Sequence, residues 1–297
     1  MFDFNKTLSN GTSRLQHIQN MRDFYDQPAV FYPAENRRQW LDIPYGTGST
    51  RQKLNIYTPL GEGPFPVIIW VHGGGWYTGD RSDRWLSCGL RFVQHGFALV
   101  SIGYRLADEA VFPQPVEDVA KGIEYIESYG AEYGLNTQRM GICGGSAGAN
   151  IAAHACLRHK GIKAAQLNCA PLDFSAYREQ YAAAGFSREA SGYPDEDTSY
   201  EALYLGGTIE ELPQACEKSN PANYLSVDAP YFLLVHGTRD LAVPYQQSVE
   251  FVNAVRKVTR DEAHAELILI EGGDHDSPMN AFEQELDFFN KHLMARP

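Results

Sequence analysis

The stretch Gly144-Gly145-Ser146-Ala147-Gly148 has the form G-x-S-x-G and stands where a strand should turn into a helix. Residues 139–143 before it are short and apolar enough for a buried strand. Residues 149–157 after it are good helix formers. A serine on so sharp a turn is lifted out of the fold, and the flanking glycines avoid clashes with neighbouring backbone. The pattern therefore predicts a strand–turn–helix unit that exposes the Ser146 hydroxyl.

Three further segments place polar or glycine residues directly after apolar, strand-like runs. The first is the glycine-rich run 72–76, HGGGW, whose backbone N–H groups could approach a substrate oxygen closely. The second ends in Asp240 and the third ends in His275. Ligands of open α/β sheets bind at the carboxyl ends of the strands, so we expect these segments to meet at Ser146.

The motifs together resemble an α/β-hydrolase serine esterase of the hormone-sensitive-lipase and acetyl-esterase type, near the bacterial feruloyl and acetylxylan esterases. The chain order of oxyanion glycines, Ser, Asp and His is the order expected for that fold. HGGGW together with GGSAG is a specific pair, and the family pattern recurs in residues 101–106 and 115–118. The resemblance covers roughly residues 50–295. It implies the α/β-hydrolase fold.

The order of the elements favours the same fold class. Strand-like and helix-like segments alternate, which is typical of a mostly parallel sheet with helices on both faces. We expect one domain over residues 1–297, with an N-terminal arm at 1–40 and a cap-like insertion at about 171–230. The expected strands lie near 40–45, 54–58, 66–71, 97–103, 139–143, 165–170, 231–236 and 266–270, and the expected helices near 83–95, 115–129, 147–159, 245–259 and 279–294.

The cap-like insertion interrupts this alternation. A connection of this length is usually functional rather than a plain loop. In the resembling family it is a position for a cap over the active site, and it is rich in Phe and Tyr here. We expect at least one of these aromatic side chains to line an acyl or aryl pocket. The alternative is that they only fold the insertion onto the domain. The arm also has two interpretations. It covers the site or a neighbouring subunit, or it simply packs on the surface of the domain.

The resemblance implies a Ser-His-Asp triad. A free serine hydroxyl is a weak nucleophile, so a base has to take the proton of Ser146, and His275 is the candidate. Asp240 would orient His275 and stabilise its imidazolium form. Asp228 is a weaker rival because it precedes its strand. The two aspartates that flank His275 are neighbours in sequence and are not placed to grip its ring.

The family pattern also indicates which groups would hold the tetrahedral oxyanion. They are the backbone N–H groups of Gly74, Gly75 and Ala147. His72 is expected to order the glycine loop rather than to take part in the chemistry. This mechanism needs no metal and no organic cofactor. The nine histidines contain no H-E-x-x-H motif and no pair at i, i+4, so a metal site is not expected.

Composition excludes several function classes. The formal net charge of −12 leaves no cationic face for phosphates, so no nucleic-acid partner is expected. No apolar run approaches the ~20 residues that a membrane span needs. The first residues lack the basic and apolar regions of a signal peptide. The five cysteines do not form the pattern of a disulfide framework, and Cys143, Cys156 and Cys169 are expected to be small buried core residues.

These observations predict a cytoplasmic carboxylesterase with a small-molecule ester substrate and leave open whether it forms a homo-oligomer. Two other functions remain as alternatives. One is an arylformamidase-type amidase, whose family carries a similar HGGxW loop and the same triad. The other is a ligand-binding relative without catalysis, although such relatives have lost the histidine that this chain keeps as His275.

Overall fold

The computed structural model describes residues 3–187 and 192–294, so residues 1–2 of the expected arm and 188–191 of the expected insertion lie outside the described residues. The described strands form one sheet in the order β1-β2-β4-β3-β5-β6-β7-β8. The strands are β1 (Arg37–Pro44), β2 (Lys53–Pro59), β3 (Phe65–Val71), β4 (Ala98–Ile102), β5 (Leu135–Gly145), β6 (Ile162–Asn168), β7 (Tyr231–Gly237) and β8 (Ala265–Ile270).

The sheet is mostly parallel. β1 pairs with β2, and β2 with β4, in antiparallel fashion, whereas every pairing from β4 through β3 to β8 is parallel. The central strands are continuous apolar runs such as Val67–Val71, which are buried throughout because helices cover both faces. The carboxyl ends of six neighbouring parallel strands therefore lie along one edge of the sheet, where loops can converge.

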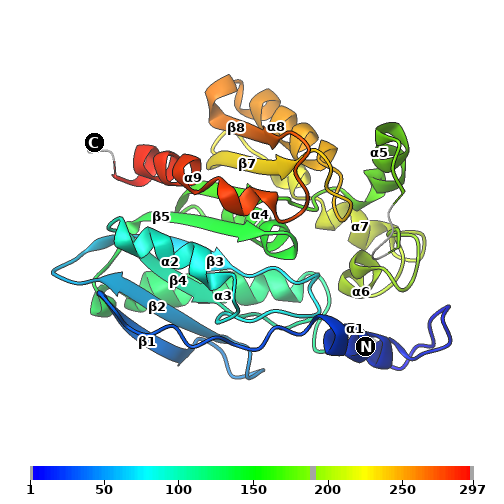
Figure 1. Ribbon diagram of the computed structural model, residues 1–297, viewed down its shortest axis with the longest axis horizontal. Helices are drawn as coiled ribbons and strands as arrows, with labels where there is room; N and C mark the ends of the chain where they lie inside the picture. Colours follow the sequence, from blue (N-terminus) through cyan, green and yellow to red (C-terminus); the bar gives the residue numbers. More distant parts are fainter. Residues whose placement is uncertain (1–2, 188–191, 295–297) are drawn as a thin grey trace.

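Helices form a layer on each face of the sheet. α2 (Leu86–Gln94) and α9 (Phe282–Phe289) bury their apolar sides in one core, and α3 (Gln114–Tyr129), α4 (Ala147–Arg158) and α8 (Gln246–Thr259) bury theirs in the other (Figure 1). This arrangement confirms the predicted α/β-hydrolase architecture. Within the described ranges no helix has both the length and the apolar character needed to cross a membrane.

Several element boundaries differ from the expected ones. β5 begins at Leu135 rather than near residue 139, because it pairs with the start of β3 before an irregularity in the register. The helix expected from residue 83 begins at Leu86. The helix expected over 279–294 is divided into a 3-10 turn (Ser277–Asn280), α9, and a π turn (Asn290–Met294).

The arm contains a helix that was not expected, α1 (Arg14–Tyr25), which begins after Ser13. The insertion contains the short helices α5 (Tyr177–Ala184), α6 (Tyr200–Leu205) and α7 (Pro213–Ser219). Figure 1 shows α1 and α6 near each other, at the side toward which β5 points. The buried Arg14 guanidinium joins them, because it donates to the backbone carbonyls of Ala202 (2.6 Å) and Leu203 in α6. The arm therefore packs on the insertion.

Candidate active site

The GGSAG stretch forms the sharp turn that its sequence predicts. Ser146 stands between the end of β5 and the start of α4 with φ 54° and ψ −127°, and its N–H donates to the Asn168 carbonyl at 2.9 Å. A Cβ atom on Gly144 would lie 2.6 Å from the Gly148 carbonyl, and one on Gly148 would overlap the carbonyls of Val71 and His72. Both glycines are therefore required by close backbone packing, which allows the turn to raise Ser146.

The glycine loop after β3 lies against this turn. A Cβ atom on Gly73 would lie 2.8 Å from the Gly145 carbonyl, so the two backbones are in contact. Gly74 and Gly75 both have positive φ, at 104° and 57°. Their N–H groups, and that of Ala147, donate no turn, loop or cap hydrogen bond to the described residues. Three backbone donors next to Ser146 are thus available to an oxygen atom of a ligand.

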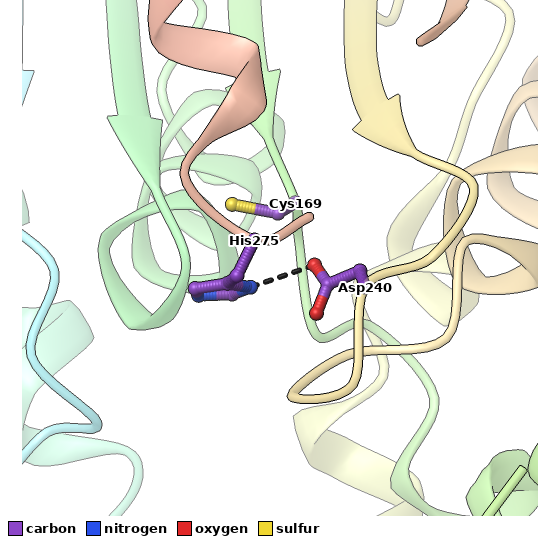
Figure 2. Close-up of side chains that lie close together, drawn as sticks. All are labelled: Cys169, Asp240 and His275. Atoms are coloured by element: carbon purple, nitrogen blue, oxygen red, sulfur yellow. Dashed lines mark hydrogen bonds and ion pairs between the residues drawn. The ribbon is translucent and has the colours of Figure 1, made fainter. Parts of the chain in front are cut away.

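Asp240 and His275 are brought together although 35 positions separate them. His275 Nδ1 donates to Asp240 Oδ2 at 2.6 Å, as Figure 2 shows. The loops that carry them are joined, because the N–H of Arg239 donates to the Gly273 carbonyl at 2.8 Å. A Cβ atom on Gly237 would overlap the carbonyls of residues 273 and 274. The loops after β7 and β8 therefore hold the Asp240 carboxylate and the His275 imidazole at hydrogen-bonding distance.

The Asp240 carboxylate is buried, and both of its oxygen atoms accept hydrogen bonds. Oδ1 accepts from the N–H groups of Ala242 and Val243, each at 2.8 Å, and His236 Nε2 lies 3.2 Å from Oδ2. Burial raises the pKa of Asp240, but His275 and His236 outweigh burial and hold that pKa well below its usual range. The carboxylate is thus ionised at neutral pH. His236, in β7, therefore helps to keep this carboxylate charged.

The electrostatics of His275 follow from its neighbours. Burial lowers the pKa of His275, but Cys169 and the Asp240 carboxylate outweigh burial and hold that pKa well above its ordinary value. The rival carboxylates do not contact the ring: Asp228 is exposed and precedes β7, and exposed Asp274 bonds Ser277 instead. Among the candidate aspartates, Asp240 is the one that the fold places beside the His275 imidazole.

One pocket of about 340 Å³ unites the predicted residues, because Gly74, Gly75, Ser146 and His275 all line it. Ala147 is buried at the first position of α4 behind Ser146. The wall is largely aromatic and apolar, from Trp70, Trp76, Tyr77, Trp85, Tyr200, Pro278 and Met279. Neither Lys nor Arg is found among its described lining residues.

The arm and the insertion both reach this pocket. Tyr200 and Glu201 line it from the insertion and Gln27 from the arm, so the prediction of a pocket-lining aromatic in the insertion is confirmed. Most other aromatics of the insertion, such as Tyr177 and Tyr204, are buried in the core instead. The alternative, that the aromatics only fold the insertion onto the domain, therefore describes most of them but not Tyr200.

Cys169 requires a correction. We expected it to be an inert core residue of a strand, but β6 ends at Asn168 and Cys169 follows with φ 42°. It is buried, yet it lines the pocket and lies beside His275 and Asp240. The signal that could have found it is its place directly after a parallel strand, which is where Asp240 and His275 were sought. Cys143 and Cys156 are buried core residues, as expected.

The fold, the serine turn and the His–Asp pair define an α/β-hydrolase. The chain belongs to the BD-FAE family, whose model matches residues 54–255. The resemblance to α/β-hydrolase esterases is thereby confirmed. A solved structure described as a truncated form of a carbohydrate esterase from gut microbiota aligns with a TM-score of 0.77 and 24% identity, over 89% of this chain and 99% of that one. That likeness concerns the fold alone.

Curated relatives carry esterase names. Esterase LipQ of Mycobacterium tuberculosis is 29% identical over 232 residues, which are 75% of this chain and 55% of LipQ. The isoprenylcysteine alpha-carbonyl methylesterase ICME of Arabidopsis thaliana is 26% identical over 259 residues, which are 83% of this chain and 58% of ICME. The chain thus spans somewhat more than half the length of these relatives.

Proposed function

We propose that this protein is a carboxylester hydrolase that acts through an acyl-enzyme on Ser146. The observation that carries the proposal is that Ser146 and the Asp240-bound His275 face the same pocket at the carboxyl ends of parallel strands. Membership of the BD-FAE family and the esterase names of the curated relatives support the same class of reaction. The presence of Ser146, Asp240 and His275 together favours catalysis over a ligand-binding role.

In the proposed mechanism, Ser146 is the nucleophile, His275 transfers protons, and Asp240 stabilises the charged form of His275. The Ser146 Oγ attacks the ester carbonyl carbon while His275 takes its proton. Because Nδ1 of His275 is hydrogen-bonded to Asp240, Nε2 is the nitrogen left to accept that proton. The imidazolium then protonates the leaving alcohol, and an acyl-enzyme remains. Water, activated by His275, attacks the acyl-enzyme and restores the free serine.

The oxyanion of each tetrahedral intermediate would be held by the N–H groups of Gly74, Gly75 and Ala147. These donors are free of other backbone partners in the described residues. Ala147 begins the 12-residue helix α4, so the positive end of the helix dipole also faces the developing charge. Fixed donors of this kind stabilise the transition state more than the ground state.

The pocket favours short-acyl or aryl esters. Its volume of about 340 Å³ is at the small end for ligand sites. Trp85 and Tyr200 give it aromatic walls that suit an aryl group or the apolar face of an acetylated sugar. The same walls would also accept an aryl formamide, so the arylformamidase alternative is tested together with the ester.

Hydrolysis of a substrate panel tests the proposal. We expect p-nitrophenyl acetate and butyrate to be cleaved about tenfold or more faster, in kcat/KM, than p-nitrophenyl octanoate, because a long acyl chain exceeds the pocket. A fluorophosphonate should stop this activity: the Ser146 Oγ displaces fluoride, and the peptide that contains Ser146 gains the mass of the phosphonyl group. Faster cleavage of an aryl formamide than of every ester would favour the amidase. No turnover and no labelling would favour a ligand-binding protein.

Substitution of Gly74 tests the oxyanion donors. At φ 104°, a Cβ on Gly74 would overlap the Thr78 carbonyl, so Gly74→Ala should rotate this peptide and misdirect the loop N–H groups. We expect kcat for p-nitrophenyl acetate to fall about 10²–10³-fold. Gly61→Ala is the matched control, because Gly61 has φ 109° with nothing near its Cβ position. Equal kcat values in the two variants would contradict the assigned donors.

A further inference from the structure

Three loops place a sulfur, a nitrogen and an oxygen donor together in the pocket. Cys169 follows β6, Asp240 follows β7 and His275 follows β8, and one ligand atom of each lies within 4.8 Å of the others. Figure 2 shows His275 and Asp240 joined by their hydrogen bond, with the Cys169 side chain beside His275. The proposed ester hydrolysis uses the imidazole and the carboxylate but gives no role to the thiol.

The backbone fixes the place of the thiol. The Cys169 N–H donates to the Val235 carbonyl at 2.9 Å, which continues the β6–β7 pairing by one residue. At φ 42° the chain then leaves the strand direction, and Cys169 lines the pocket together with His275. The sulfur is thus held on the same scaffold as its two neighbours and does not depend on a mobile surface loop.

We propose that Cys169, Asp240 and His275 form a site for Zn²⁺ that inhibits the enzyme reversibly. Thiolate, imidazole and carboxylate are the three ligand types that Zn²⁺ takes in proteins, and three protein ligands leave a fourth position for water or another small ligand. The sulfur, nitrogen and oxygen donors of this cluster therefore suit Zn²⁺ better than a hard cation such as Mg²⁺, which prefers oxygen ligands alone. The fourth position would face the pocket that Ser146 lines.

The geometry needs a modest adjustment. Bonds of about 2.0–2.3 Å at tetrahedral angles separate ligand atoms by about 3.3–3.6 Å. The present atoms lie within 4.8 Å of one another, so the outermost pair has to come about 1 Å closer. If Nδ1 is the ligating nitrogen, the 2.6 Å hydrogen bond between His275 and Asp240 also has to open by about 1 Å. When the metal binds, the Cys169 thiol proton and the proton on the ligating His275 nitrogen both go to solvent, and the thiolate and the freed nitrogen lone pair then bind the metal.

The charge around the site favours a cation. Exposed Asp276 lines the same pocket, and the described wall of the pocket contains no Lys or Arg to oppose a divalent ion. The ion would occupy the space beside the imidazole and would withdraw His275 from proton transfer. Inhibition rests on the proposed function, because it requires His275 to be the base. Metal binding does not rest on it.

Cobalt absorption tests the site without any activity. Zn²⁺ is colourless, so Co²⁺ serves as the probe, and a thiolate ligand gives a charge-transfer band in the near ultraviolet. We expect the wild-type chain to show this band at one equivalent of Co²⁺ and to lose it when Zn²⁺ is added. Cys169→Ser should lack the band. Cys88→Ala is the control, because Cys88 is half-buried in α2 and should leave the band intact.

Inhibition is measured separately. Zn²⁺ should slow hydrolysis of p-nitrophenyl acetate by about tenfold or more, with recovery in EDTA and no effect of Mg²⁺. Cys169→Ala, normalised to its own metal-free rate, should need about tenfold more Zn²⁺ for the same inhibition. No cobalt band, or a band or inhibition unchanged by substitution of Cys169, would overturn the site. A cobalt band in a chain without esterase activity would support the metal site and contradict the proposed function alone.

Discussion

Replacement of Ser146 with alanine is expected to lower kcat/KM for p-nitrophenyl acetate by about 10⁴-fold or more. The reason is chemical, because alanine offers no oxygen to form the acyl-enzyme and only the oxyanion donors and substrate binding remain. The fold should persist, since the methyl group replaces a side chain that makes no cap hydrogen bond at the start of α4. Steady-state kinetics and a thermal melt of the same sample measure both effects.

The control for this variant is Ser128→Ala. Ser128 is exposed on α3, where its hydroxyl donates to the Glu124 carbonyl, and it is outside the pocket. We expect the control to retain the wild-type rate. Activity of Ser146→Ala within about tenfold of wild type would contradict an acyl-enzyme on Ser146. Loss of activity together with a large fall in Tm would require Ser146→Cys as a second variant, which keeps a nucleophilic atom at the turn.

Replacement of Asp240 with asparagine is the second large effect, expected to lower the maximal rate by about 10⁴-fold. The amide cannot stabilise the imidazolium, and it can hold the ring in the wrong tautomer by donating to Nδ1. It would also place an NH₂ group near the N–H groups of Ala242 and Val243, which now donate to Oδ1, or near His236. Some loss of stability is therefore expected too.

The pH profile shows whether Asp240 acts through His275. The base has to be neutral, so activity rises as pH increases through the pKa of His275. Burial lowers that pKa, but Cys169 and Asp240 raise it well above its ordinary value, so the rising limb of the wild type should lie above pH ~6.5. Asp240→Asn removes a charge that favours imidazolium. The pKa should fall and the limb should move to lower pH.

Asp228→Asn is the matched control, since Asp228 is exposed before β7. It should leave both the rate and the profile unchanged. A residual rate in Asp240→Asn within about tenfold of wild type, or a limb that stays in place, would mean that another group orients His275.

Much of the site could be predicted from sequence because its demands are local. Gly144 and Gly148 are needed because the turn packs against neighbouring backbone there, and the G-x-S-x-G motif has glycine at both of these positions. The glycines after β3 have positive φ for a similar reason. Asp240 and His275 could be placed because each follows an apolar strand, and parallel strands bring their carboxyl ends to one edge.

The less predictable parts depend on distant contacts. Helix α1 is polar along most of its length, so its sequence has little helical periodicity. It is held by its buried residues Arg14 and Ile18, which meet α6 of the insertion. Likewise His236 could be recognised as the end of a strand, but its 3.2 Å approach to Asp240 depends on the path of the loop between them.

The sequence by itself determined the hydrolase fold and the placement of Ser146, Asp240 and His275 after strands, because strand ends and glycine turns are encoded within a few residues of one another. Only the tertiary structure decided what surrounds His275. Cys169 lies at His275 because β6, β7 and β8 are neighbours in the sheet and because the chain turns at φ 42° directly after β6. The strand order is not local to the cysteine, and its residue type gives no sign of a positive φ, so the sequence indicated only that Cys169 lies near the end of a strand.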